Sequence, residues 1–221
     1  MRLKAFDYRY NASKALEGKK IFMILVTIVY GILSGLFTSV VDYFVMKYAG
    51  DIVFFERVIL FISLMSIVYS LFVISPINYG YISISKKIYR DEKANVNDLF
   101  DGFSNYPKVI MLNLLLFVKT FLWTLLFIIP GIVKSFAYSM STYILDDNPN
   151  MSPKEAIAKF VQLMKGNKFR LFCLSLSFIG WYLVSILTCG ILMFYVTPYM
   201  QVAFAAFYDD LIQNQSVIDL E

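Results

Sequence analysis

Histidine is absent from this sequence of 221 residues, and cysteine occurs only at Cys173 and Cys189. Histidine is the most frequent general base and transition-metal ligand in proteins, and two cysteines alone cannot complete a structural zinc site. We therefore predict no catalytic site, no metal site and no cofactor. Both cysteines lie in apolar sequence, and we interpret them as small apolar side chains rather than as a disulfide.

Charged residues are also scarce, at 16% of the chain against 59% hydrophobic residues. Soluble domains carry about 25% charged residues and do not sustain apolar runs of about 20 residues. The composition therefore predicts a protein that crosses the lipid bilayer several times. The formal net charge of +4 is interpreted as basic loops at a membrane rather than as affinity for nucleic acid.

Apolar segments divide the chain into spans and short connections. Pro130-Gly131 separates the third segment from the fourth, and Thr188-Cys189-Gly190 separates the fifth from the sixth, so both pairs are expected to form tight hairpins. We predict an all-α membrane protein, a single domain over residues 1–221, with six transmembrane helices in three helical hairpins. The predicted spans are residues 21–41, 58–78, 109–129, 131–145, 169–187 and 191–211.

Basic residues are distributed unequally between the two sides of these spans. Most of the 20 lysines and arginines lie before the first span or in the second and fourth connections, whereas Lys47 and Arg57 lie on the other side. Positive residues near span ends are retained in the cytoplasm. Both termini are therefore predicted to be cytoplasmic.

A short amphipathic and basic segment precedes each odd-numbered span. In the third of these segments, Ser152 and Glu155 form a capping box with Pro153 at the first helical position, which predicts an interfacial helix over residues 153–165. Each even-numbered span ends in tyrosine and acidic residues. These features indicate either a threefold internal repeat or independent positive loops and interfacial tyrosines that imitate one.

Two lysines fall inside the predicted spans. Lys119 lies at the middle of residues 109–129, and Gln201 lies at a comparable depth in the sixth span. Ionisable residues in spans usually face the interior of a bundle and are candidates for function. Lys119 is therefore interpreted either as a ligand-binding residue, with Gln201 beside it, or as a hydrogen-bonding lysine that stabilises the bundle.

The second lysine, Lys134, lies about one turn from the corner at Pro130-Gly131 and heads a polar helix face that includes Tyr138 and, beside it, Ser139. Such a face lines a cavity or forms ordinary hydrogen bonds between helices. A serine hydrolase with a lysine base would also need an oxyanion hole, and nothing in the sequence marks one. We therefore place Lys119, Gln201, Lys134, Tyr138 and Ser139 in a candidate ligand cavity.

Acidic pairs end the fourth and sixth predicted spans, where the helix dipole disfavours carboxylates. We expect basic residues at the entry of the fifth span to compensate them in a cytoplasmic charge girdle. A divalent cation held by the two pairs is the alternative. The girdle comprises Asp146, Asp147, Asp209, Asp210, Lys165, Lys168 and Arg170.

Small residues form a stripe on the first span at Gly31, Gly35 and Ser39. Stripes of this kind allow close helix packing in membranes. The stripe is predicted to be a packing seam, either within the chain or between subunits of a homo-oligomer. Pro76 and Pro198 are expected to kink the second and sixth spans.

Several motifs resemble the bacterial domain-of-unknown-function 975 family of integral membrane proteins. The resemblance implies a bacterial cytoplasmic membrane protein and implies no activity. The motifs are Pro130-Gly131-Ile132 with Lys134 and Tyr138, Asp147 with Pro149, residues 165–168, Phe178 to Trp181, and Pro198-Tyr199 with Phe207-Tyr208.

The expected function is non-enzymatic. The leading hypothesis is a membrane protein that transports or binds a small or lipid-like solute in a polar cavity among its spans. The alternative is an accessory or scaffold protein that binds lipids or a partner membrane protein through basic interfacial helices. The expected partners are the lipid bilayer and a membrane protein or a second copy of the chain, with no nucleic acid.

Overall fold

The computed structural model describes residues 4–48, 61–62, 64–126, 140–188 and 190–218. Every regular element in these parts of the chain is a helix, which confirms the predicted all-α class. Three helices are long and apolar enough to cross a membrane, and they suggest a membrane protein. These three are Lys20–Lys47, Leu64–Tyr89 and Lys168–Leu187, the last of which spans two shorter elements.

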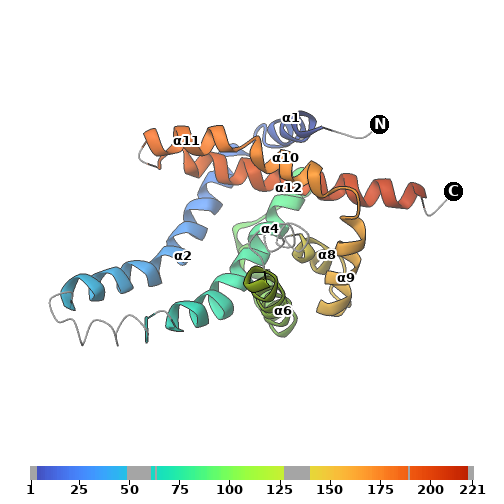
Figure 1. Ribbon diagram of the computed structural model, residues 1–221. Coiled ribbons are helices and arrows are strands. Elements are labelled where there is room, and N and C mark those ends of the chain that lie inside the picture. Colours follow the sequence, from blue (N-terminus) through green and yellow to red (C-terminus); the bar gives the residue numbers. More distant parts are fainter. Residues whose placement is uncertain (1–3, 49–60, 63, 127–139, 189, 219–221) are drawn as a thin grey trace.

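The elements follow one another with short connections and no strands among the described residues (Figure 1). A π-helix, η1, leads directly into α4, and a 3₁₀-helix, η2, leads into α5. The helices are α1 (Ala5–Ala15), α2 (Lys20–Tyr48), η1 (Ser70–Ile74), α4 (Ser75–Tyr89), η2 (Val96–Phe100), α5 (Asp101–Ser104), α6 (Tyr106–Leu126), α8 (Ser141–Asp147), α9 (Pro153–Leu163), α10 (Lys168–Leu176), α11 (Ile179–Leu187) and α12 (Met193–Ile218).

Helix α9 shows how local sequence sets a boundary. The Glu155 backbone N–H donates to the Ser152 hydroxyl, and the Ser152 backbone N–H donates to the Glu155 carboxylate. These two bonds satisfy donors at a helix start that have no partner within the helix. Helix α9 therefore begins at Pro153, as the capping box predicts, and its buried residues Ala156, Ile157 and Phe160 recur at helical spacing.

The helix around Pro76 is longer than the second predicted span. We expect that span to end at Asn78, but the helix continues to Tyr89. Hydropathy misses the extension because it contains Ser83, Ser85 and Lys86, all of which are buried. Buried polar residues inside a helix weaken the apolar signal that defines a span, although the backbone remains helical.

The core of the molecule lies where α4 and α12 contact each other, and both helices are buried along most of the contact. Two glycines allow η2 and α5 to approach α4 closely. A Cβ atom at Gly80 would overlap the Leu99 carbonyl, and one at Gly102 would overlap the Pro76 carbonyl. Glycine is required at both positions because the backbones themselves are in contact.

The amphipathic segments each pack on the last helix of another part of the chain. Three units can be defined, each starting with an amphipathic segment: α1 to α4, η2 to α8, and α9 to α12. The segment that starts the second unit packs on α4, and the segment that starts the third packs on α8. The first segment, α1, packs on α12 and so closes the ring. The contacts of α4 with η2 and of α8 with α9 join consecutive elements, so the internal repeat stays a prediction.

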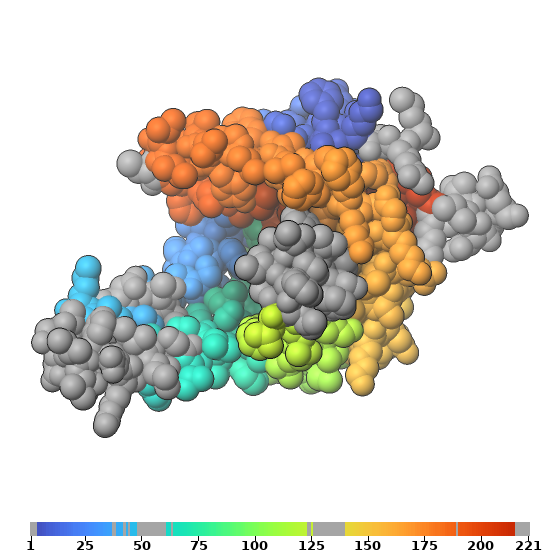
Figure 2. All heavy atoms as spheres, in the orientation of Figure 1, coloured from blue at the N-terminus to red at the C-terminus, as the bar shows by residue number. Residues whose placement is uncertain are grey.

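Much apolar surface stays outside this core. In the space-filling view the molecule is hollowed between α11 and the far end of α2, with the middle of α2 at the back (Figure 2). Ile32 and Leu36 of α2 and Leu183 of α11 are more than half exposed. Exposed apolar side chains on long helices are expected where lipid is the solvent.

The small-residue stripe on α2 is not a close internal seam. Among the described residues, a Cβ atom at Gly35 would meet nothing within 4 Å, and one at Gly31 would meet only Phe194 at 3.9 Å. Ser39 is exposed, and its hydroxyl donates to the Gly35 carbonyl of the same helix. Among the described residues, no helix therefore packs closely on this stripe, and a seam within the chain or between subunits stays a prediction.

Candidate functional site

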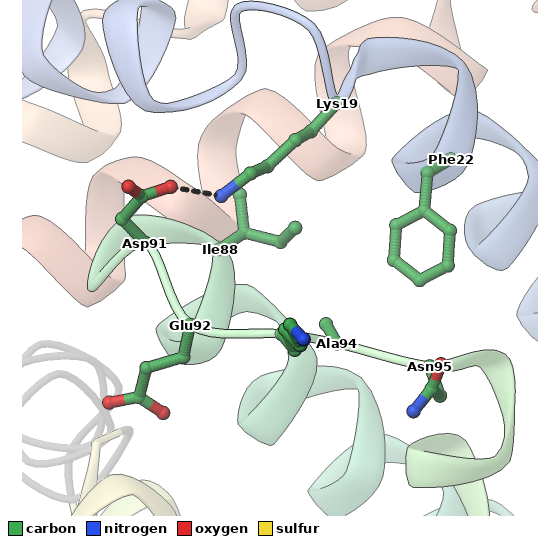
Figure 3. Close-up of a pocket in the computed structure, with 8 residues that line it drawn as sticks. Lys19, Phe22, Ile88, Asp91, Glu92, Ala94 and Asn95 are labelled. Carbon is green, nitrogen blue, oxygen red and sulfur yellow. Dashed lines mark hydrogen bonds and ion pairs between the residues drawn. The ribbon is translucent and has the colours of Figure 1, made fainter.

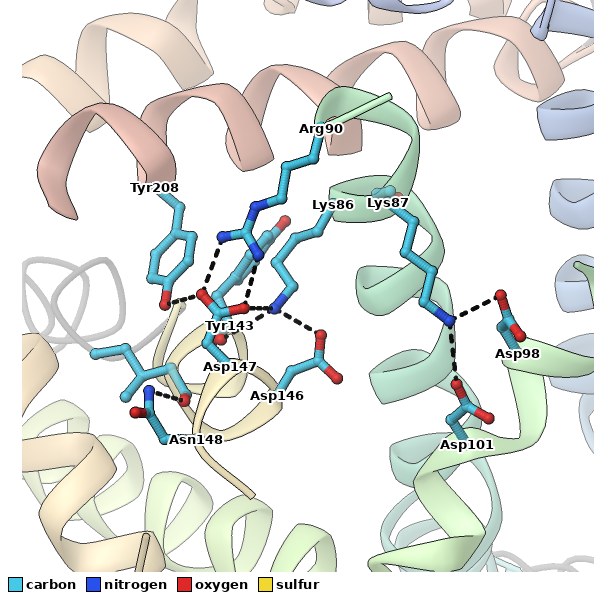
Figure 4. Close-up of polar contacts among 12 residues, drawn as sticks. Lys86, Lys87, Arg90, Asp98, Asp101, Tyr143, Asp146, Asp147, Asn148 and Tyr208 are labelled. Carbon is cyan, nitrogen blue, oxygen red and sulfur yellow. Dashed lines mark hydrogen bonds and ion pairs between the residues drawn. The ribbon is translucent and has the colours of Figure 1, made fainter. Parts of the chain in front are cut away.

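Charged side chains gather where α4, α8 and α12 meet (Figure 4). Lys86 and Arg90 lie four residues apart on α4 and therefore share one face of the helix. The Lys86 side chain is only 5% exposed, and its Nζ lies 2.6 Å from Asp146 Oδ2 and 2.5 Å from Asp147 Oδ1. We call the group formed by Lys86, Arg90, Asp146, Asp147, Tyr208 and Asp209 the charged cluster.

Arg90 connects the two acidic pairs of this cluster. Its guanidinium donates two hydrogen bonds to Asp147, at 2.9 and 3.0 Å, and two to Asp209, at 2.6 and 3.1 Å. The Tyr208 hydroxyl donates to Asp147 Oδ2 at 2.8 Å. Arginine can bind carboxylates in this way because its planar N–H groups form a fixed fork. Helices α4, α8 and α12 are therefore joined through one side chain.

Ionisation of Asp147 depends on these donors. Burial opposes the charge, but the hydrogen bonds from Arg90 and Lys86 outweigh it and lower the pKa of Asp147 to about 2. The hydrogen bonds that Arg90 donates to Asp209 and Asp147 also raise the pKa of Arg90 above its ordinary value. Asp147 and Arg90 are thus fully ionised near neutral pH, and their charges compensate each other.

Two smaller groups attach the amphipathic segments to the core. Arg170 of α10 lies 2.6 Å from Asp210 of α12, and the hydroxyl of Tyr8 in α1 donates to the same carboxylate at 2.7 Å. Lys87 of α4 lies 2.9 Å from Asp98 and 3.6 Å from Asp101, at the η2–α5 connection.

The predicted girdle is only partly assembled from the expected residues. Arg170 contacts Asp210, but Lys165 and Lys168 form no ion pair with the four carboxylates among the residues that the structure describes. Lys86 and Arg90, which sequence reasoning missed, supply the charge instead. Their spacing of four residues on one helix was the available signal. Nor do any three acidic or cysteine side chains in the described ranges gather as metal ligands.

A cavity of about 730 Å³ lies among α2, the helix around Pro76 and α6. We call it the larger cavity. Its polar lining consists of Tyr30, Ser66, Ser70, Ser75, Asn78, Asn113 and Thr120, and its apolar lining of Ile67, Leu71, Ile74, Leu114, Leu116 and Phe117.

Pro76 shapes one wall of the larger cavity. Proline has no N–H to donate to the carbonyl four residues earlier, which here belongs to Phe72. The Tyr106 hydroxyl donates to that carbonyl at 3.1 Å, and the preceding residues 70–74 form the π-helix η1. Single turns of π-helix are frequent at functional sites because they redirect side chains. Ser70 and Ser75 both line the cavity from this irregular stretch.

A second cavity, of about 230 Å³, shares Asn78 with the first. We call it the smaller cavity. Gln201 lines it, and the Tyr143 hydroxyl donates to Gln201 Oε1 at 3.2 Å. Its full lining is Asn78, Ile82, Met140, Tyr143, Leu171, Ser175, Gln201 and Phe204.

The sequence predicts two lysines in a ligand cavity, and the structure describes only one of them. Lys119 is half-buried on α6, but it is not among the described residues that line either cavity. Asn113, Phe117 and Thr120 line the larger cavity, and a rotation of about 100° per residue places Lys119 away from their face. Lys134, Tyr138 and Ser139 lie outside the described residues.

A third hollow, of about 440 Å³, lies at the start of α2 beside the connection from α4 to η2 (Figure 3). Lys19 Nζ lies 2.5 Å from Asp91 Oδ1 across it. Asp91 is exposed and has a positive φ of 58°, which marks the tight turn after α4. Both basic and acidic side chains line this hollow, so it does not favour a ligand of either charge.

These observations define the class of the protein as an all-helical chain with apolar helices long enough for a membrane. Residues 125–215 match the family model described as "Protein of unknown function (DUF975)", and this match supports membership of that family. The match covers the carboxyl-terminal part of the chain, including the acidic pairs of α8 and α12. No curated protein and no solved structure matches the chain.

Proposed function

We propose that this chain is a non-enzymatic, multi-pass protein of the bacterial cytoplasmic membrane that binds a small or lipid-like solute in the larger cavity, as a step in transport or in sequestration. In this proposal six spans form three hairpins, and both termini are cytoplasmic. The observation that carries the proposal is the larger cavity itself, which has seven polar residues in its lining.

The rim of the larger cavity supports entry from the bilayer. Ile67 and Phe117 line the cavity, and both are more than half exposed. An exposed apolar side chain on a membrane helix contacts lipid tails, so the cavity is continuous with the surface that lipid covers. A solute with an apolar part can enter sideways, while its polar part reaches the hydroxyl and amide groups inside.

The charged cluster supports a binding protein rather than an enzyme. Each carboxylate in it is held by a lysine or arginine, so none is free to act as a general base near neutral pH. In this proposal the cluster holds three helices together on the cytoplasmic side of the cavities. Catalysis is assigned to no residue.

Filling the cavity tests the proposal. Ser70 lines the larger cavity and is exposed to it, so Ser70→Phe is expected to reduce the bound solute without disturbing the core. Ser39→Phe is the matched control, because Ser39 is an exposed serine on α2 that does not line the cavity. Each variant is purified in native lipid discs, and molecules enriched over empty discs are identified by mass spectrometry.

The expected result is a molecule enriched at about one per chain with the wild type and with Ser39→Phe, and depleted with Ser70→Phe. Equal enrichment in all three proteins, or none in any, contradicts the proposal. Uptake by vesicles that contain the purified protein then separates transport from sequestration.

Exposed aromatic side chains favour a second candidate function, that of a scaffold at the membrane surface. Phe6 of α1 and Phe169 of α10 are exposed, beside basic residues of the amphipathic segments. Aromatic and basic side chains together bind the interface of anionic membranes or a partner protein. A stoichiometric partner that co-purifies with the wild type and is lost with Phe6→Ser would support the scaffold.

A further inference from the structure

Two polar side chains in the larger cavity have hydrogen-bonding groups without partners among the described residues. We propose that they bind the head group of an amphiphile, and that this head group is uncharged and carries hydroxyl or amide groups. The two residues are Ser75 and Asn78, one turn apart on α4. This inference rests on the proposed function, because it specifies the ligand of the same cavity.

Ser75 provides the stronger evidence of the two residues. It is 8% exposed, and its Oγ is buried without a hydrogen-bond partner. Ser85 of the same helix donates to the Tyr81 carbonyl, one turn earlier. A buried hydroxyl without this hydrogen bond has lost its bonds to water, which is unfavourable in free energy. A hydrogen bond to a ligand can offset that loss. Ser75 lines the larger cavity, so a ligand in that cavity lies beside this residue.

Asn78 lines both cavities and lies where they adjoin. No hydrogen bond joins its amide to any residue that the structure describes, although the amide has two donors and an acceptor carbonyl. An amide that offers donors and an acceptor together complements a hydroxyl or amide, which can both accept and donate. A phosphate or an ammonium group would use only half of this capacity.

The absence of charge among the described lining residues disfavours an ionic head group. None of the described residues around either cavity is lysine, arginine, aspartate or glutamate. Transfer of an ion from water into an apolar region is strongly unfavourable unless an opposite charge compensates it. An uncharged head group has no such requirement. The neighbouring apolar residues Leu71, Ile74 and Leu116 then contact the beginning of its acyl chain.

The test compares two probes that share one tail. N-oleoylethanolamine is uncharged and carries an amide and a hydroxyl, and its phosphate ester adds negative charge to the same molecule. Each radiolabelled probe is added to lipid discs that contain the full-length protein, and binding above that of empty discs is measured. The wild type is expected to bind the neutral probe at least tenfold more tightly than its phosphate ester.

Two variants assign this binding to the named residues. Asn78→Leu is expected to weaken binding of the neutral probe about tenfold, and Ser75→Ala about fivefold, because each removes hydrogen bonds to the head group. Ser75→Ala removes an unpartnered hydroxyl, so it is expected to fold normally. Ser85→Ala is the control: Ser85 is a buried serine of the same helix that lines neither cavity, and binding should be unchanged.

The outcomes separate this inference from the proposed function. If the phosphate ester binds equally or better, and Ser70→Phe abolishes its binding, the cavity is a binding site but the inference about the head group is wrong. If neither probe binds and Ser70→Phe also leaves the co-purified molecules unchanged, the proposed function itself fails. If Ser75→Ala and Asn78→Leu bind the neutral probe like the wild type, the two residues are not its ligands.

Discussion

The charged cluster and the larger cavity are both polar regions along one helix, yet their polar groups are satisfied in opposite ways. In the charged cluster, Arg90 alone donates four hydrogen bonds, to Asp147 and Asp209. In the larger cavity, Ser75 is buried without a partner. The two positions are 15 residues apart, so the difference lies within a single continuous helix.

This difference separates a polar region that supports the fold from one that is available to a ligand. Buried charges persist only when they are paired, and a paired charge has little capacity left for another molecule. Neutral hydroxyl and amide groups can remain unpaired at a smaller cost. We therefore expect substitutions in the cluster to change stability, and substitutions in the cavity to change binding.

The largest expected effect on stability is that of Arg90→Met. The substitution keeps the length of the side chain but leaves Asp147 and Asp209 without a shared partner. We expect a loss of about 2–3 kcal/mol, between the values for exposed and fully buried pairs, because the Arg90 side chain is 31% exposed. Thermal unfolding in detergent micelles measures the change.

Lys19→Met is the control for Arg90→Met, since it also removes a cation from an ion pair. Its partner Asp91 is almost fully exposed, so no measurable shift in the unfolding temperature is expected. Similar small shifts for both variants would contradict the structural role of the charged cluster.

Low pH is expected to disrupt the charged cluster as well. The pKa of Asp147 is lowered to about 2, whereas an unfolded aspartate titrates near pH 3.9. The stability that this carboxylate contributes is therefore present above about pH 4 and is lost as the pH falls through about 2. The unfolding temperature of the wild type should decrease across this window more steeply than that of Asp147→Asn. Parallel curves would show that Asp147 does not carry the dependence.

Tyr106→Phe tests a single hydrogen bond to the backbone beside the larger cavity, which is neutral but satisfied. Pro76 leaves the Phe72 carbonyl without its helical partner, and the Tyr106 hydroxyl replaces that partner. Loss of this hydroxyl is expected to lower stability by about 1 kcal/mol, while the ring contact with Phe103 is retained. Thermal unfolding is the measurement, and Tyr10→Phe on the exposed side of α1 should be neutral. If both variants behave alike, the Phe72 carbonyl is satisfied in another way.

The smallest expected effect on stability is that of Ser75→Ala. Because the hydroxyl has no partner, its removal should leave the unfolding temperature unchanged or raise it, in contrast to every substitution in the charged cluster. Calorimetry in micelles without added amphiphile measures this. A clear decrease would show that Ser75 supports the fold and would remove the distinction between the two regions.

The sequence predicts the helical class, the family and the start of α9, because these depend on composition, motifs and local capping. It does not predict which cations meet Asp146 and Asp147. Lys165 and Lys168 are closer in the sequence, but the contact of α4 with α8 brings Lys86 to these carboxylates. Such pairs depend on how distant helices pack, which periodicity does not encode.

The lining of the larger cavity could not be predicted from the sequence, for a related reason. Gln201 and Lys119 stand out because they are polar within apolar runs, yet among the described residues only Gln201 lines one of these two cavities. Which face of α6 lines the cavity depends on the tertiary structure, and that face carries Asn113 and Thr120. Ser75 gave no signal, since a serine beside a proline is ordinary in a helix.

The contact between α1 and α12 has a consequence for biosynthesis. Tyr8 and Asp210, which it joins, are 202 residues apart in the chain. Contacts of such separation form late, because most of the polypeptide must be ordered before they become favourable. While the ribosome is still making α12, helix α1 can contact α4 and α10 of its own chain but not yet α12. Membrane insertion factors or chaperones would then meet the surface of α1 that α12 later covers.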